Sequence, residues 1–172
     1  MAVAASDLNA PFPDKAHNHR RCIDHAMEEA EAACRRNGAR LTDIRRQVLE
    51  LVWQGHRPVG AYDILEALGR QGRKAQPPTV YRALEFLQRM GLVHRIETLN
   101  AFVGCSRPGL DHTSQFLICR GCGRSAEIED QKIGTLIAAA AGRSGFSVES
   151  QSIEAVGLCM ECRETQSGKA NA

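Results

Sequence analysis

The sequence of 172 residues predicts an α+β fold, and three observations support this prediction. Apolar residues recur every three or four positions in several stretches between residues 22 and 90, which is the spacing of amphipathic helices. Residues 92–98 and 101–105 alternate between apolar and polar side chains on either side of Leu99-Asn100, which predicts a β-hairpin. The remaining chain combines short strand patterns, one helical stretch and two pairs of cysteines. We therefore expect a helical N-terminal half and a smaller mixed C-terminal half.

The composition is that of a globular protein, with 43% hydrophobic and 24% charged residues. The length suits one mid-sized domain or two small ones. The longest apolar run, residues 136–141, is much shorter than the roughly 18 residues that a membrane span needs. The N-terminus shows no continuous apolar segment typical of a secretory signal. We expect a cytoplasmic protein that does not act at a membrane.

Four helices are expected in the N-terminal half. After a flexible tail over residues 1–20, a first helix with a modest apolar stripe covers residues 22–36. Thr42 suits the N-cap of the second helix, which Gly55 ends. A third helix carries the apolar positions of residues 61–68.

The fourth helix begins at Pro77, because proline has no amide hydrogen to leave unpaired in a first turn. Its apolar stripe leaves a polar face that carries Thr79, Tyr81 and Arg82 near the start. Helices followed by a two-stranded hairpin form the pattern of a winged helix-turn-helix. In such a domain the recognition helix enters the major groove of DNA and the hairpin touches the backbone.

The residue types on this polar face suit DNA. Arg82 can make a bidentate contact to guanine and Tyr81 can pack on a thymine methyl group. The alternative is that Tyr81 packs on its own domain and that Arg82 contacts phosphate or faces solvent. Tyr62, at the start of the preceding helix, can contact phosphate or a base. From Arg35 to Arg95 the 12 basic residues exceed the 5 acidic ones by seven, which favours a polyanionic partner.

Four of the seven cysteines form two pairs, Cys119-Arg-Gly-Cys122 and Cys159-Met-Glu-Cys162, with 36 residues between them. An intracellular chain does not normally hold such pairs as structural disulfides. Two Cys-x-x-Cys pairs can close a tetrahedral four-thiolate zinc site. A redox-active pair is the alternative, but no βαβ pattern surrounds either pair.

In the C-terminal half, the pattern predicts strands over residues 115–119, 125–129 and 147–155. It also predicts a helix over 132–141 whose apolar residues face inward. This part has only about 60 residues, so a structural metal or dimerisation would help to stabilise it. The resulting division is a flexible tail (1–20), a winged-helix DNA-binding domain (21–98), a hinge (99–105), a metal-binding dimerisation domain (106–165) and a flexible tail (166–172).

Taken together, several motifs resemble the ferric uptake regulator family of bacterial metal-sensing repressors. The stretch Pro77-Pro78-Thr79-Val80-Tyr81-Arg82-Ala83-Leu84 and the two cysteine pairs carry the resemblance, which covers about residues 25–165. Within the family, the chain is most similar to the members that sense zinc. The local motifs behind this similarity are residues 61–63, 91–94, 111–114 and 153–159.

The resemblance implies two zinc ions per chain and a homodimer assembled through the C-terminal domain. It implies a structural zinc held by Cys119, Cys122, Cys159 and Cys162. It implies a regulatory zinc held by His94, Cys105, His112 and Glu127. It also places Tyr62, Tyr81 and Arg82 against DNA, with Thr79 beside them on the recognition helix.

The proposed regulatory ligands favour zinc, because one thiolate, two imidazoles and one carboxylate suit a tetrahedral zinc site. Cys105 is the strongest indication, since iron(II) more often takes harder oxygen and nitrogen ligands. The alternatives are an ordinary strand histidine at position 94, a buried apolar cysteine at 105 and a solvated carboxylate at 127. Family members that sense iron or manganese usually carry His-His-Asp-His before the first cysteine pair. Here only Asp111-His112 match, which counts against iron.

These inferences predict a zinc-responsive transcriptional repressor of zinc-uptake genes that binds an inverted repeat in double-stranded operator DNA. No motif indicates catalysis, so neither an enzyme nor a small organic substrate is expected. The alternatives are another metal or peroxide sensor of the family, responsive for example to iron or manganese, a thiol-disulfide redox enzyme, and a generic zinc-ribbon interaction protein. Cys22 and Cys34 match no motif and receive no role.

Overall fold

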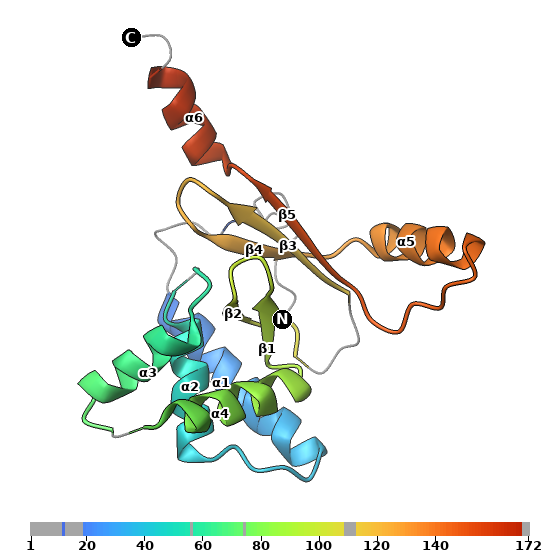
Figure 1. The fold of residues 1–172 in the computed structure, drawn as a ribbon. Coiled ribbons are helices and arrows are strands. Elements are labelled where there is room, and N and C mark those ends of the chain that lie inside the picture. Colours follow the sequence, from blue (N-terminus) through green and yellow to red (C-terminus); the bar gives the residue numbers. More distant parts are fainter. Residues whose placement is uncertain (1–11, 13–18, 56, 74, 109–112, 170–172) are drawn as a thin grey trace. The chain divides into compact units, whose positions relative to one another are not determined.

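The computed structural model describes residue 12 and residues 19–55, 57–73, 75–108 and 113–169 (Figure 1). The chain divides into two compact units. The winged-helix unit covers Asp14–Leu110. The metal-site unit covers Asp111–Ala172 with Met1–Pro13, of which the structure describes Phe12. No helix in the described part of the chain is long and apolar enough to cross a membrane.

The winged-helix unit contains the four predicted helices and the predicted hairpin. Thr42 occupies the N-cap position of the second helix, and Pro77 begins the fourth, as the sequence predicts. The elements are α1 (His19–Arg36), α2 (Asp43–Trp53), α3 (Ala61–Arg70), α4 (Pro77–Arg89), β1 (Val93–Ile96) and β2 (Ala101–Gly104).

One apolar core holds this unit together. The helical stripes supply fully buried side chains such as Leu49, Ile64 and Leu87. In a close-packed interior such side chains fix the helices relative to one another, because any shift opens a void. The core therefore holds α4 with its apolar stripe inward and its polar face in solvent.

Strands β1 and β2 form an antiparallel hairpin in which His94 lies opposite Val103. Asn100 closes the turn with a positive φ of 46°, a conformation that asparagine tolerates better than most residues. Phe102 also pairs with Val59 in an isolated bridge. Residues 101–104, part of the segment expected to act as a hinge, are thus the second wing strand.

The metal-site unit is a three-stranded sheet with two helices, in the strand order β4-β3-β5. Its central strand pairs antiparallel with β4 and parallel with β5. The elements are β3 (Ser114–Cys119), β4 (Ser125–Ile128), α5 (Gln131–Arg143), β5 (Ser152–Gly157) and α6 (Met160–Lys169). With the winged-helix unit, these elements confirm the predicted α+β fold class.

Two local expectations for this unit were wrong. The last strand begins at Ser152 rather than at residue 147, because β3 offers pairing partners only from Ser114 onward. Most of the apolar residues of α5 do not face inward, since Leu136, Ile137 and Ala140 are exposed and only Ile133 is half-buried. Residues 166–169 continue α6, and the flexibility expected of the tail over 166–172 stays a prediction.

Candidate metal centres and nucleic-acid interface

The sheet register brings the two cysteine pairs together. The parallel pairing of β3 with β5 sets Cys119 opposite Gly157, so both strands leave the sheet at the same end. Cys122 follows in the turn after β3, and Cys159 and Cys162 follow β5. The four sulfur atoms lie within 4.8 Å of one another.

The spacing of these sulfur atoms fits a tetrahedral zinc ion. The Sγ atoms of Cys122 and Cys159 are 3.9 Å apart, and zinc–sulfur bonds of about 2.3 Å place tetrahedral sulfurs about 3.8 Å apart. The cysteines are free thiols, so the pairs are not closed as disulfides. A Cβ atom at Gly121 would lie 2.9 Å from the Sγ of Cys162, so the first pair requires glycine at this position.

Hydrogen-bond donors favour the thiolate form of two of the four cysteines, Cys119 and Cys122. Burial raises the pKa of the Cys119 thiol, but backbone N–H donors from Cys159, Cys122 and Gly121 outweigh burial and lower the pKa to about 6. Burial likewise opposes ionisation of Cys122, but hydrogen bonding from Arg124 lowers its pKa overall. The neighbouring thiol of Cys159 and burial instead raise the pKa of Cys162 to about 12, so this thiol would lose its proton when a metal ion binds. Because zinc binds the thiolate form, the environment of Cys119 and Cys122 suits a metal site.

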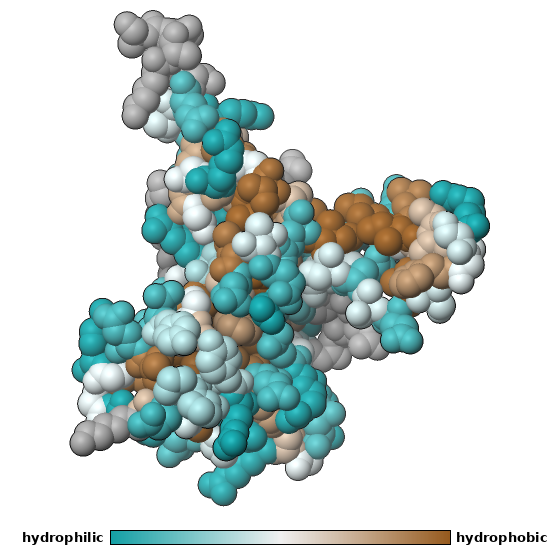
Figure 2. Space-filling model, in the orientation of Figure 1, coloured by the Kyte–Doolittle hydropathy of each residue, from teal (hydrophilic) through white to brown (hydrophobic). Residues whose placement is uncertain are grey.

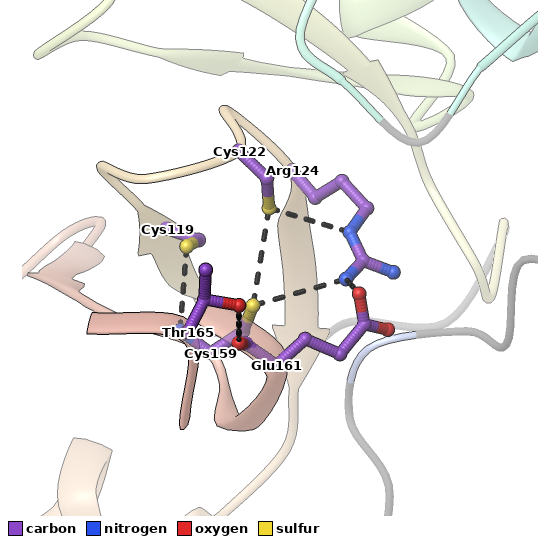
Figure 3. Close-up of polar contacts among 6 residues, drawn as sticks. All are labelled: Cys119, Cys122, Arg124, Cys159, Glu161 and Thr165. Carbon is purple, nitrogen blue, oxygen red and sulfur yellow. Dashed lines mark hydrogen bonds and ion pairs between the residues drawn. The ribbon is translucent and has the colours of Figure 1, made fainter. Parts of the chain in front are cut away.

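Sequence reasoning missed two residues that complete this cluster. Arg124 lies beside the sulfur atoms of Cys122 and Cys159, and its guanidinium forms an ion pair with Glu161 (Figure 3). Arg124 lies two residues after the first cysteine pair and Glu161 lies within the second, and their opposite charges were the available signal.

The hairpin brings together two of the expected regulatory ligands. His94 lies on β1 opposite Val103, and Cys105 lies two positions beyond Val103, so both side chains occupy one face of the wing. The backbone N–H of Cys105 donates to the carbonyl of Leu92, which extends the hairpin by one residue. A ring nitrogen of His94 and the Sγ of Cys105 lie within 4.8 Å of each other. His94 is half-buried and Cys105 is buried.

The other two expected ligands lie elsewhere in the sequence. Glu127 is half-buried on β4 of the metal-site unit, opposite Phe116. His112 lies outside the described residues.

Trp53 is a further residue that the sequence did not reveal. Its indole packs so closely on Gly104 that a Cβ atom there would lie 2.1 Å from Cε2 of the ring. This contact braces the wing immediately before Cys105 against the end of α2.

The residues expected to contact DNA are exposed at the starts of α3 and α4. Tyr62 is 71% exposed and Tyr81 is 48% exposed, whereas the intervening core residue Val80 is buried. Thr79 and Arg82 are also exposed. Large aromatic side chains left in solvent beside helix N-termini suit a polyanionic partner. In contrast, Arg45 packs over the ring of Phe86 and Arg46 pairs with Glu31, so these two arginines already have partners within the unit.

A helix-turn-helix with a hairpin wing, in a chain that also carries a four-cysteine cluster, defines a metal-binding transcription regulator of the winged-helix class. The chain belongs to the ferric uptake regulator family, whose model matches residues 36–156. Members of this family regulate transcription and are not enzymes.

Within this family, the chain is similar to relatives and solved structures that are named as zinc uptake regulators. The chain is 37% identical to the zinc uptake regulation protein of Escherichia coli (strain K12) over 143 residues, or 81% of this chain and 82% of the relative. It is similar to the structure of a zinc uptake regulator complexed with zinc and DNA, with a TM-score of 0.80, 36% identity and coverage of 84% and 97% of the two chains. The crystal structure of holo XcZur gives a TM-score of 0.75 at 40% identity, with coverage of 80% and 96%.

Proposed function

We propose that the protein is a zinc-responsive repressor of zinc-uptake genes. Its operator would be an inverted repeat, bound by a homodimer when the regulatory site is filled. The observation that carries the choice of zinc is the pairing of a thiol, Cys105, with an imidazole, His94, on one face of the wing. Sulfur and nitrogen donors together favour zinc over iron or manganese. The zinc-binding and DNA-binding relatives support the same choice.

We assign two zinc ions to each chain. Cys119, Cys122, Cys159 and Cys162 hold the structural ion, since four thiolates form a closed site with no open position for a substrate. The regulatory ion belongs to the wing pair with His112 and Glu127. These four ligands come from both units, so ligation restricts how the two units are oriented, and DNA affinity follows zinc occupancy.

The DNA-contacting role belongs to the exposed residues of the winged-helix unit. Arg82 and Tyr81 read base edges from the start of α4, with Thr79 beside them, and Tyr62 contacts the backbone or a base. Replacing Arg82 by alanine is expected to weaken operator binding by about 1–3 kcal/mol and to relax specificity at one base pair. A regulator that binds chromosomal operators acts in the bacterial cytoplasm.

We assign the interface of the homodimer to the metal-site unit. Its helix α5 exposes Leu136 and Ile137, and Phe146 beyond its end is also exposed. Figure 2 shows this apolar surface along α5. Contiguous exposed apolar surface of this kind marks a protein–protein interface.

Operator binding measured against buffered free zinc tests this function. The DNA is a promoter fragment from a zinc-transporter gene of the same genome, and the proteins are the wild type, Cys105→Ser and the control Cys22→Ser. We expect binding that rises steeply with zinc in the wild type and the control and fails in Cys105→Ser. Metal analysis should find two zinc ions per wild-type chain and one per Cys105→Ser chain.

The alternatives within the family give different outcomes in the same titration. Binding driven by iron(II) or manganese(II) but not by zinc would assign the protein to another metal sensor. If peroxide treatment of the iron-loaded protein abolishes operator binding, the protein is a peroxide sensor. Binding that no metal changes would refute a sensory role.

A further inference from the structure

Arg124 is a buried cation beside the four cysteines. Only 8% of its surface is exposed, although arginine is normally among the most exposed residues. Its Nε lies 3.4 Å from the Sγ of Cys122 and its Nη2 lies 3.7 Å from the Sγ of Cys159 (Figure 3). A charged side chain is buried at such a position only where specific partners compensate for the lost water.

The two sulfur partners of Arg124 come from different cysteine pairs. Cys122 belongs to the turn after β3, whereas Cys159 follows β5, 37 residues further along the chain. One planar guanidinium therefore spans the two segments that a metal ion would join. A lysine could not do this equally well, because its ammonium lacks the rigid fork of donors.

Glu161 fixes the orientation of this guanidinium. Its carboxylate Oε2 lies 3.0 Å from Nη2 of Arg124, and Glu161 itself sits between Cys159 and Cys162. The ring of Phe12 lies 5.9 Å from the guanidinium carbon and adds a cation–π contact. Arg124 is thus held from several sides and keeps its donors directed at sulfur.

Electrostatics explains why a cation belongs at this site. Four thiolates around one divalent zinc ion leave a net charge of about −2 in a partly buried environment. A guanidinium brings this charge closer to zero, and its N–H groups draw electron density from the sulfur atoms. Thiolates with such donors are weaker nucleophiles and hold their metal more firmly.

We propose that Arg124 is a positioning residue that ties the two cysteine pairs together and shields their sulfur atoms from electrophiles, so that the structural zinc is retained. This inference rests on the proposed structural zinc and is independent of DNA binding and of the sensed metal. The chain supplies a matched control, because Arg120 lies within the first cysteine pair and is exposed.

The test measures zinc release from the full-length, zinc-loaded protein. A Cys105→Ser background leaves only the structural ion, and 4-(2-pyridylazo)resorcinol reports zinc freed when N-ethylmaleimide alkylates the thiolates. We expect Arg124→Gln to release zinc about tenfold faster than the parent. Arg120→Gln, which removes the same charge from the exposed position, should release zinc at the parental rate.

Two further variants keep the test decisive if Arg124→Gln folds poorly. Arg124→Lys retains the charge without the fork and should give an intermediate rate, and Glu161→Gln should give a smaller acceleration by freeing the guanidinium. Equal release rates in all variants, each still holding one zinc ion, would overturn the role of Arg124 but leave the structural zinc intact. A parent protein that holds no zinc in this background would overturn both proposals.

Discussion

The two units of the molecule are stabilised in different ways. Every residue of the main apolar core lies between Ala26 and Phe102 in the winged-helix unit. In the metal-site unit, the most deeply buried of the described side chains are Phe116, Cys119 and the polar Gln115, each 1% exposed, while α5 buries only a glycine. One unit thus has a core that can sustain it, and for the other we expect a metal cross-link and a partner chain to supply the missing stability.

This difference matches the proposed roles. A DNA-reading surface needs a rigid scaffold, and a close-packed helical core supplies one. A unit that joins two chains can leave its apolar surface exposed until the partner covers it. The comparison therefore predicts that substitutions in one unit leave the other unit folded, and the following experiments test that independence.

The largest effect is expected from Cys159→Ser. Removing one ligand of four should release the structural zinc and unfold the metal-site unit, because zinc binding in such small domains supplies the folding free energy, on the order of 10 kcal/mol. In amide NMR spectra, resonances from β3 and β5 should lose their dispersion while those from α2 and α4 keep theirs. Unfolding of both units in this variant, but not in Cys22→Ser, would contradict their independence.

The reverse experiment is Leu84→Ala in the core of the winged-helix unit. Leu84 is 1% exposed, and such a truncation destabilises a domain by about 2–5 kcal/mol through lost burial and the cavity left behind. Chemical denaturation followed by the fluorescence of Trp53, the only tryptophan, should show the loss. The zinc content of the four-cysteine site should not change.

A smaller effect is expected from Gly104→Ala, which tests one contact inside the winged-helix unit, that between Gly104 and the Trp53 ring. The new methyl group must displace the Trp53 ring, at an expected cost of about 1–3 kcal/mol. Displacement should shift the tryptophan emission and weaken binding of the regulatory zinc through the neighbouring Cys105. Gly69→Ala is the control, because a Cβ atom there meets nothing within 4 Å, and it should be neutral or stabilising.

The sequence predicted the winged-helix unit better than the metal-site unit, and the reason is physical. Helical periodicity reports which face of a helix is apolar, and in α4 that face packs in the core of its own unit, so its buried stripe and its exposed Tyr81 and Arg82 could be predicted. In α5 the same periodicity predicted burial, but Leu136 remains exposed because apolar spacing does not distinguish a core from a partner chain.

Prediction of the candidate sites from the sequence is limited in the same way. The spacing of the four cysteines predicted their cluster, since the ligands themselves carry the pattern. Trp53 against Gly104 and Arg124 beside Cys159 depend on how distant segments pack, and no local period encodes such pairs. The full regulatory ligand set stays a prediction, with His94 and Cys105 brought together on the wing.

A more modest effect on association is expected from Leu136→Asp. Leu136 is 69% exposed, so the folded unit should tolerate the change, whereas a buried charge in a dimer interface should weaken the dimer at least about tenfold, or by about 1.4 kcal/mol. Sedimentation over a range of protein concentrations measures the loss. Lys132→Asp places the same charge in the exposed first turn of α5 and should leave the dimer unchanged. If neither variant dissociates the dimer, the dimer interface lies on another surface.

The smallest effect is expected at the ion pair between Glu31 of α1 and Arg46 of α2. The hydrogen bond and charge of Arg46 hold the pKa of Glu31 below its ordinary value of 4.5. The ionised carboxylate therefore stabilises the unit at pH values above 4.5, and this contribution is lost as the pH falls through the lowered pKa. Glu31→Gln should slightly lower the thermal unfolding midpoint at neutral pH and have no effect in strong acid. Glu66→Gln removes the more exposed pair with Arg70, so it should change the midpoint less at either pH.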